Sequence, residues 1–287
     1  MTSITNDALQ RFVLEGSNVR GELVHLDDTW RTILSRTDYP APVRRVLGEA
    51  LSAVALLSAT IKYEGSLILQ MTGDGPVNLL VVQARADRTL RGLARWRDVV
   101  QSTSLREQFG AGRLVMTVDP GPGMERYQSL INITADSIAE LLLGYFDQSE
   151  QLSTRLWLTA NEQSCAGMLL QRLPGDEDDE EDDEAWERAV ILASTVQEVE
   201  LQEAASEMVL ARLFALQGVR VYEPESFRFH CGCSREVITT SLGAMPIDEL
   251  REIIEEEGEI KVDCEFCGAK YLFDEAAVEA LATEPTA

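Results

Sequence analysis

The chain has 287 residues, 45% of them hydrophobic, and a formal net charge of −24 from 25 basic and 49 acidic side chains. A chain of this length is expected to form about two domains with enough apolar residues for a core. The negative charge argues against nucleic acid and an anionic membrane surface as partners, because both require Lys and Arg gathered on one face. The N-terminal residues lack a secretory signal, and no apolar run reaches the roughly 18 residues of a membrane span. We therefore expect a cytoplasmic protein.

Residues 1–175 are predicted to form an N-terminal α+β domain of mixed sheet and helices. The clearest helix runs from Val43 to Ile61, where apolar residues recur every three or four positions. A second amphipathic helix is predicted at 137–146. The predicted strands cover residues 20–26, 65–71, 77–82, 90–96, 113–118, 127–133, 154–159 and 163–170. Because turn signals rather than helices join most of these strands, the class is α+β.

This first domain offers little catalytic chemistry, and we do not expect an enzyme. His25 lies between Val24 and Leu26 in a predicted strand, where a structural role is favoured over a catalytic one. Cys165 is solitary in a strand-like segment and is predicted to be a buried, inert thiol. The sequence contains no Walker-type phosphate-binding loop, so no ATP-dependent step is expected.

Residues 176–225 are predicted to form an acidic, helical linker. Nine consecutive acidic residues, 176–184, open it and are expected to be solvated and mobile. From Ala185 to Gln217 apolar residues follow a helical spacing, broken at Ser194-Thr195. Fourteen acidic and two basic side chains between 176 and 217 give this stretch a charge of −12. An ordinary docked helical linker and a metastable segment, weakened by its own charge repulsion, both fit this pattern.

Residues 226–287 contain four of the five cysteines and are predicted to form a small zinc-binding module. Cys231-Gly-Cys233 is followed, after thirty residues, by Cys264-Glu-Phe-Cys267 and Gly268. Two close pairs separated by a loop of this length match a four-thiolate zinc site. His230 is expected to lie outside the ligand set, because four thiolates already complete it. With strands predicted at 236–242 and 260–262 and a helix at 246–257, the module has few apolar residues and should depend on its metal for folding.

The Cys231-Gly-Cys233 pair suggests that the zinc site has a role beyond holding the fold. If the metal leaves, a disulfide within this half closes a small strained ring, and strained disulfides are readily reduced again. Metal-bound thiolates are also the oxidisable form of cysteine. The residues are therefore compatible with a reversible oxidant sensor whose output is loss of zinc and local unfolding.

The cysteine motifs resemble those of the redox-regulated bacterial heat-shock chaperones, the HslO or 33 kDa chaperonin family. The resemblance rests on Cys231-Gly-Cys233-Ser-Arg and on Cys264-Glu-Phe-Cys267-Gly, followed by Tyr271 and Phe273. It extends over nearly the whole chain, through landmarks at residues 19–21, 47–50, 73–76, 91–92 and 171–174. Cys165 departs from the switch pattern and leaves room for a side reaction or an intermolecular disulfide.

This resemblance implies a cytoplasmic, ATP-independent holdase that binds unfolding client proteins during oxidative stress. It also implies that the N-terminal domain, residues 1–175, is the substrate-binding domain. The reduced form would carry one zinc ion on Cys231, Cys233, Cys264 and Cys267 and would be inactive. Oxidation would form the redox-active disulfides Cys231–Cys233 and Cys264–Cys267, release zinc, and unfold the module and the linker. The active species would be a homodimer.

Two other functions fit parts of the sequence. A zinc-ribbon protein that binds nucleic acid would need basic residues near the cysteines, but Arg235, Lys261 and Lys270 are outnumbered by acidic neighbours. A thiol–disulfide oxidoreductase would use Cys264 and Cys267 in a thioredoxin-like βαβ setting, which the pattern does not predict.

Overall fold

The computed structural model describes residues 7–121, 123–149, 152–174 and 180–283. Contacts between residues divide the chain into two compact units, Met1–His230 and Cys231–Ala287. The predicted linker packs within the first unit, whereas the predicted three-domain boundaries stay a prediction. Among the described residues no helix is both long and apolar enough to cross a membrane.

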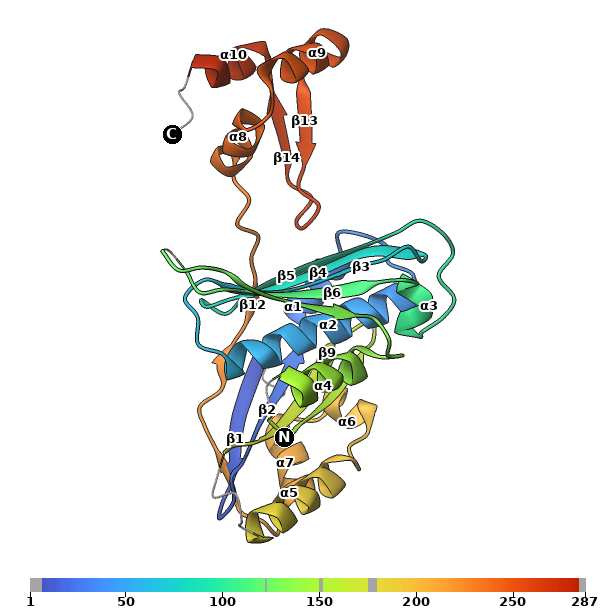
Figure 1. Cartoon of the computed structure of the whole chain (residues 1–287), viewed down its shortest axis with the longest axis vertical. Helices are drawn as coiled ribbons and strands as arrows, with labels where there is room; N and C mark the ends of the chain where they lie inside the picture. Colours follow the sequence, from blue (N-terminus) through green and yellow to red (C-terminus); the bar gives the residue numbers. More distant parts are fainter. Residues whose placement is uncertain (1–6, 122, 150–151, 175–179, 284–287) are drawn as a thin grey trace. The chain divides into compact units, whose positions relative to one another are not determined.

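The first unit is built on two mainly antiparallel sheets (Figure 1). Sheet A has the strand order β10-β1-β2-β9-β8, with β11 also paired to β1. Its strands are β1 (Ala8–Leu14), β2 (Val19–Leu26), β8 (Thr154–Ala160), β9 (Cys165–Arg172), β10 (Val219–Val221) and β11 (Glu225–Ser226). Sheet B has the order β12-β5-β4-β3-β6-β7. Its strands are β3 (Ser66–Thr72), β4 (Val77–Arg85), β5 (Thr89–Trp96), β6 (Arg113–Asp119), β7 (Tyr127–Asn132) and β12 (Arg228–Phe229).

Helix α2 (Ala41–Thr60) lies between the two sheets and carries the main core (Figure 1). Pro42 is the second residue of this helix, in the first turn, where the missing amide hydrogen of proline costs no helical hydrogen bond. Both faces of the helix are buried, which explains its many small residues. Its Val54 and Leu57 belong to one apolar cluster with Leu69 of β3 and Leu169 of β9. The helix predicted at Val43–Ile61 is therefore confirmed.

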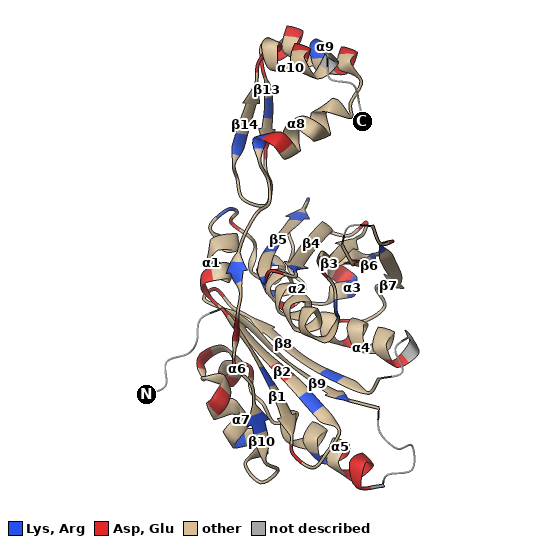
Figure 2. Ribbon diagram, turned by 90° about the vertical axis from the view of Figure 1, so that its left-hand side faces the viewer, with Lys and Arg blue, Asp and Glu red and all other residues tan. Residues whose placement is uncertain are grey.

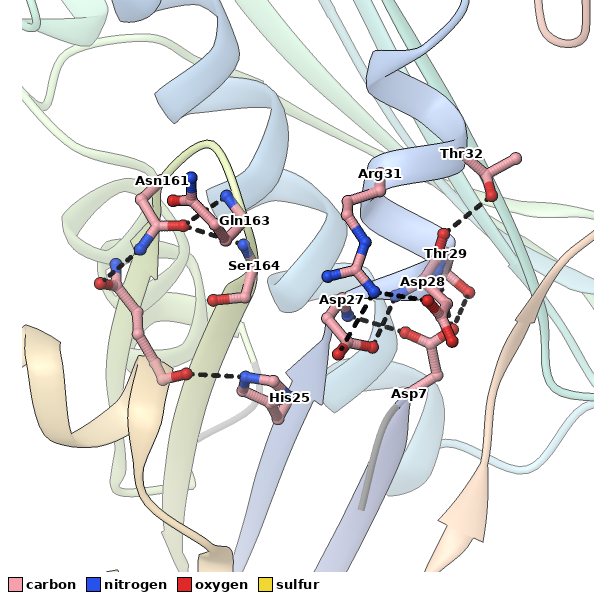
Figure 3. Close-up of polar contacts among 11 residues, drawn as sticks. Asp7, His25, Asp27, Asp28, Thr29, Arg31, Thr32, Asn161, Gln163 and Ser164 are labelled. Carbon is pink, nitrogen blue, oxygen red and sulfur yellow. Dashed lines mark hydrogen bonds and ion pairs between the residues drawn. The ribbon is translucent and has the colours of Figure 1, made fainter. Parts of the chain in front are cut away.

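Shorter helices complete this core. They are α1 (Asp28–Leu34), α3 (Leu105–Phe109) and α4 (Ile138–Ser149). Asp7 fixes the start of α1: its carboxylate accepts hydrogen bonds from the Asp27 and Thr29 amides and from the Thr29 hydroxyl, at 2.7–2.8 Å (Figure 3). Burial raises the pKa of this carboxyl, against the lowering effect of these hydrogen bonds.

Three helices of the linker cover the outer face of sheet A. They are α5 (Glu180–Ala193), α6 (Glu198–Glu203) and α7 (Ser206–Phe214). The break predicted at Ser194-Thr195 is present, because α5 ends at Ala193. Part of the acidic run, residues 176–179, lies outside the described residues. Of the remainder, Glu181, Asp183 and Glu184 are exposed, as predicted for a solvated run. The segment is nevertheless ordered, because it begins α5, and Asp182 is buried, where its carboxylate accepts hydrogen bonds from Asn18.

The second unit consists of one hairpin and three helices. The hairpin pairs β13 (Ile260–Asp263) with β14 (Lys270–Phe273), and the helices are α8 (Arg235–Gly243), α9 (Ile247–Glu257) and α10 (Glu275–Thr283). Figure 2 shows acidic residues, in red, along α9 and α10. The α+β class predicted for the chain is confirmed by this arrangement of sheets and helices.

The strand predicted at 236–242 is wrong, because this segment forms helix α8. Its β-branched residues favour a strand, but the Ser234 side chain caps the helix by accepting a hydrogen bond from the Val237 amide at 3.3 Å. The hydroxyls of Thr239, Thr240 and Ser241 bond back to carbonyls four residues earlier, and so remain satisfied within a helix. Packing of Leu242 into the small core then decides the conformation.

Candidate functional site

The four clustered cysteines come from two short loops of the second unit. Cys231 and Cys233 lie in the segment that leads into α8, and Cys264 and Cys267 lie in the turn between β13 and β14. The turn is tight: the amides of Cys267 and Gly268 both donate to the carbonyl of Cys264. Gly268 has a φ of +70°, a conformation that favours glycine.

The sulfur atoms of the four cysteines form one compact group. All four lie within 4.8 Å of one another. Cys231 Sγ is 3.6 Å from Cys264 Sγ, and Cys233 Sγ is 3.2 Å from Cys267 Sγ. In a tetrahedral zinc site, bonds of about 2.3 Å place the sulfurs about 3.8 Å apart. The group therefore has the composition and the spacing to hold a metal ion.

Hydrogen bonds to sulfur stabilise negative charge on Cys233, while burial raises the pKa values of the Cys231 and Cys267 thiols. The Tyr271 hydroxyl donates to Cys233 Sγ at 3.2 Å. Burial raises the pKa of the Cys233 thiol, but the bonds from Tyr271 and the neighbouring cysteines outweigh burial and lower that pKa to about 7. The Ala269 amide also donates to the sulfur of Cys267. The turn around Gly268 thus presents a backbone amide, that of Ala269, to a sulfur.

The core that supports the cysteine loops is small. Its buried residues are Leu242, Leu250, Ile260, Phe273 and Val278. The Arg235 guanidinium lies 4.4 Å from the centre of the Phe273 ring and donates to the Leu272 carbonyl at 2.8 Å, which ties the start of α8 to β14. A core of this size supplies little stability by itself, and a shared metal would join both loops.

The remaining residues that the sequence singled out lie elsewhere. Cys165 is fully buried in β9, and burial raises the pKa of its thiol to about 12, so it is a poor nucleophile. His230 is exposed at the end of the first unit and does not belong to the close group of cysteines. His25 is buried on β2 and faces the linker.

Apart from the cysteine group of the second unit, the first unit contains an apolar interface between sheet A and the linker. Apolar side chains from β1, β2 and β9 form one cluster with the linker helices. The strand residues are Phe12, Leu14, Val19, Leu23, Ala166, Met168 and Leu170, and the linker residues include Trp186, Leu201, Val209, Leu213 and Phe214. The rings of Phe12 and Phe214 lie 5.8 Å apart. Release of the linker would expose this entire apolar face.

Polar contacts fix the position of α6 on the sheet (Figure 3). The Nε2 atom of His25 lies 2.8 Å from the carbonyl oxygen of Gln202. The Gln202 side chain accepts from Asn161 Nδ2 at 2.8 Å and donates to Thr159 Oγ1 at 2.6 Å. Glu198 accepts from Arg45 at 2.9 Å. Reasoning from the sequence missed Gln202, Asn161 and Thr159, because their pairing depends on residues about 40 positions apart along the chain.

Comparison with known proteins agrees with this architecture. Residues 7–274 match the model of the Hsp33 protein family. The chain belongs to the Hsp33 family. It is 48% identical over 278 residues to the 33 kDa chaperonin of Nitrosococcus oceani, covering 97% of this chain and 95% of that protein. It is 40% identical over 283 residues to the 33 kDa chaperonin of Vibrio cholerae, covering 97% and 96%.

The fold is likewise that of an Hsp33 protein. The crystal structure of the 33 kDa chaperonin of Thermotoga maritima superposes with a TM-score of 0.80, covering 96% of this chain and 97% of that one, at 23% identity. Membership of the Hsp33 family gives the chain a chaperone role rather than an enzymatic one, and a chaperone binds client proteins. The predicted family and the predicted absence of an enzymatic role are confirmed.

Proposed function

We propose that this protein is a redox-regulated, ATP-independent holdase of the cytoplasm, which binds unfolding client proteins under oxidative stress. The observation that carries the proposal is the group of four sulfurs, from two loops, within 4.8 Å of one another in a unit with five buried core residues. One zinc ion held by Cys231, Cys233, Cys264 and Cys267 would tie the two loops together in the reduced state. A reducing cytoplasm would keep these thiolates available.

Oxidation removes the ligands on which the second unit depends. Two equivalents of hydrogen peroxide oxidise the four thiolates to two disulfides; four protons are taken up, and four water molecules are formed. A disulfide sulfur is not a zinc ligand in such sites, so the metal leaves with its 2+ charge. The second unit then loses the cross-link between its loops and unfolds.

The pairing that we propose is Cys231 with Cys233 and Cys264 with Cys267. In the folded unit the short sulfur contacts run between the loops, from Cys231 to Cys264 and from Cys233 to Cys267. Once the first disulfide has loosened the unit, however, the two loops are free to move apart, because thirty residues lie between them along the chain. The two cysteines within each loop stay close to one another. Peptide mapping of the oxidised protein by mass spectrometry distinguishes the two patterns.

Unfolding of the second unit and of the linker would make apolar surface available to clients. The linker cluster on sheet A supplies such surface on both the strands and the helices. The linker also carries the charge repulsion of residues 176–217, which opposes docking. We expect the oxidised protein to be a homodimer, since the same apolar surface favours association; light scattering before and after oxidation tests this.

The deciding experiment compares zinc-loaded, reduced protein with peroxide-treated protein. Zinc release is followed with a chromogenic chelator, and aggregation of a chemically denatured client is followed by light scattering without ATP. We expect about one zinc released per chain and suppression of aggregation only after oxidation. The matched control is Cys165→Ser, which should behave like the original protein. Zinc retention with no gain in suppression would refute the proposal.

The two alternative functions receive less support. Most cations of the second unit are engaged: Arg251 binds Glu279 at 2.7 Å, Lys261 lies 3.3 Å from Glu259, and Arg235 contacts Phe273. These contacts disfavour a phosphate-binding surface. Cys264 and Cys267 lie in a hairpin turn rather than at the start of a helix in a βαβ unit, which disfavours a thioredoxin-like oxidoreductase.

A further inference from the structure

Strand β7 is an open edge of sheet B. It is the last strand in the order β12-β5-β4-β3-β6-β7, and β6 is its one partner among the described strands. Figure 2 shows β7 at the rim of this sheet. Its sequence, Tyr-Gln-Ser-Leu-Ile-Asn, carries no charge, and its register with β6 is continuous from Tyr127 to Asn132. Such edges are normally protected by charged side chains, proline or a bulge, because an unpaired strand edge recruits other chains.

The other edges of the two large sheets are short or protected. Strand β10 has three residues, and β11 and β12 have two each. At the remaining edge, β8 contains the charged residue Arg155 and packs against α4 and α6. Among the described strands of sheets A and B, β7 alone is a long edge with neither charge, proline nor bulge. Its free edge therefore needs an explanation.

Every second residue of β7 directs its main-chain groups away from the sheet. The Ile133 amide donates to the Gly112 carbonyl at 2.9 Å, which fixes the hydrogen-bonded positions of the β6–β7 pair. These positions alternate along an antiparallel pair, so the amides and carbonyls between them point outward. The outward residues are Gln128, Leu130 and Asn132. Their main-chain groups have no hydrogen-bond partner among the described residues, and they present the donors and acceptors that an added strand binds.

A groove of about 580 Å³ is lined by β7 and α4. The Ser129 Oγ atom of the strand lies 3.0 Å from the Tyr145 hydroxyl of the helix, which holds the two elements beside one another. The lining includes all six residues of β7 and, from α4, Glu140, Leu141, Gly144 and Tyr145. Among the described lining residues Glu140 alone is charged. The groove thus follows the open edge and is mostly uncharged.

Gly144 keeps the groove wide. It lies in the middle of α4, where glycine is less favourable than alanine. Its φ is not positive, so the backbone does not require glycine. A Cβ atom here would have no heavy atom within 4 Å beyond its chain neighbours and the backbone of its own helix. Packing among the described residues therefore does not require glycine either, whereas close approach of another backbone to α4 does.

We propose that the groove between β7 and α4 binds an extended segment of a client polypeptide as an additional strand of sheet B. Unfolding proteins expose such segments, and main-chain hydrogen bonds to an edge strand accept many sequences. The inference rests on the chaperone role but goes beyond the redox switch, because the groove belongs to neither the linker nor the cysteine unit. A second copy of the chain is disfavoured as the occupant, since two chains of charge −24 repel each other.

The test uses a fluorescent synthetic peptide of alternating valine and threonine between terminal lysines, and a version N-methylated at every valine and threonine. Methylation keeps the side chains but removes the main-chain donors. Binding to the full chain is measured by fluorescence anisotropy, with zinc-loaded reduced protein and with peroxide-treated protein. We expect the parent peptide to bind both forms and the methylated peptide to bind at least about tenfold more weakly. Equal binding of the two peptides, no binding of the parent, or binding only after oxidation overturns the proposal.

One pair of variants assigns the binding to the edge of β7. Leu130→Pro removes an outward amide and no hydrogen bond to β6, and an edge strand accepts proline at such a position. We expect it to weaken peptide binding by about tenfold or more. The control, Leu130→Thr, loses the same exposed side chain but keeps the amide and a residue that favours strands, and should bind within about threefold of the original protein. Equal binding by the two variants overturns the assignment.

A second pair tests the space at Gly144. Gly144→Leu fills the groove and should weaken peptide binding by about tenfold or more, while Gly144→Ala fills less of it and should cause a smaller loss. Both substitutions favour the helix and should raise the midpoint of thermal unfolding. Weaker binding by a more stable protein separates a binding role from a merely structural one. Unchanged peptide binding in Gly144→Leu overturns the proposal.

Further measurements on the same proteins separate this inference from its competitors. Zinc release and suppression of client aggregation test the proposed function, and their failure with intact peptide binding refutes that function alone. Light scattering of the reduced protein tests self-association: a dimer that Leu130→Pro converts to a monomer overturns the proposal in favour of a second copy. Circular dichroism verifies each fold, and the Gly144 pair decides the outcome if Leu130→Pro does not fold.

Discussion

His25 connects the first unit's sheet to its linker: its Nε2 atom lies 2.8 Å from the backbone carbonyl oxygen of Gln202 in α6. The imidazole is 7% exposed, and within the described part of the chain its Nδ1 atom has no hydrogen-bond partner. The ring therefore donates through Nε2 and holds the carbonyl of a helix that has only six residues. A short helix contributes little stability of its own, so such tertiary contacts matter.

Replacement of His25 by Leu is expected to loosen the linker in the reduced protein. The substitution keeps an apolar side chain against the sheet but leaves the Gln202 carbonyl without its donor, at a cost of about 1 kcal/mol. Hydrogen exchange of residues 198–214 and their cleavage by a protease should increase. The control is His230→Leu, at the exposed histidine outside this interface. Equal protection of the linker in the original protein and in His25→Leu would refute this role.

Phe214→Ala is expected to release α7 from sheet A. Phe214 is 1% exposed and contacts the Phe12 ring, so truncation leaves a cavity and costs about 3–4 kcal/mol. The reduced variant should bind a dye for apolar surfaces and suppress client aggregation before any peroxide is added. Leu216→Ala provides the matched control, because Leu216 lies two residues further on and is fully exposed. A variant without dye binding, with its linker still resistant to protease, would show that this contact does not hold the linker.

The sequence predicted correctly those helices and strands whose hydrophobic periodicity matches the surfaces that they bury. The long stripe from Val43 to Ile61 became α2, because both of its faces meet a sheet. The segment around Val237 and Thr240 was predicted incorrectly, because a serine cap and a small core favour a helix there over the strand preference of β-branched residues. Strand β1 was not predicted, since its residues are buried on both faces only after α2 and the linker have docked.

The four cysteines could be predicted as one site because metal ligation imposes spacing on the sequence. The hydrogen-bond partners of these cysteines could not be predicted from the sequence. Tyr271 reaches Cys233 because the β13–β14 pairing and the loop before α8 bring together residues 38 positions apart. Asp182 shows a further limit: charge patterning predicts a solvated acidic run, whereas Asn18 binds this carboxylate in a buried position.

Tyr271→Phe is expected to weaken binding of zinc at the proposed four-cysteine site without removing a ligand. The phenol donates to Cys233 Sγ, and loss of a hydrogen bond to a metal ligand typically lowers affinity by about tenfold or more. Competition with a chromogenic chelator measures the affinity of the reduced protein. The control is Tyr222→Phe, at an exposed tyrosine in the first unit. Unchanged affinity in Tyr271→Phe would mean that the hydroxyl does not support the site.

Glu22 makes the stability of the first unit dependent on pH. It lies on β2 opposite Arg11, is 2% exposed, and its Oε2 atom has no hydrogen-bond partner among the described residues. Burial raises the pKa of this carboxyl to about 7, although Arg20 and Arg11 act to lower it. In the unfolded chain the pKa of this carboxyl has its ordinary value of 4.5. The folded protein therefore binds this proton more tightly than the unfolded chain does.

The sign of the effect follows from proton linkage. Between about pH 4.5 and pH 7 the unfolded chain has lost the Glu22 proton while the folded chain keeps it, so the free energy of unfolding falls as pH rises through this window. Glu22→Gln removes the titrating group. We expect the variant to match the original protein near pH 4.5 and to be more stable at pH 8, by on the order of 3 kcal/mol.

Urea unfolding of the first unit, followed by tryptophan fluorescence at pH 4.5, 6 and 8, measures this difference. Tryptophan is a suitable probe because Trp30 is fully buried in the core of that unit. Glu64→Gln, at an exposed glutamate, removes one carboxylate without removing a buried charge and should leave the pH dependence unchanged. A constant difference between Glu22→Gln and the original protein at all three pH values would contradict the raised pKa, because a purely steric effect does not titrate.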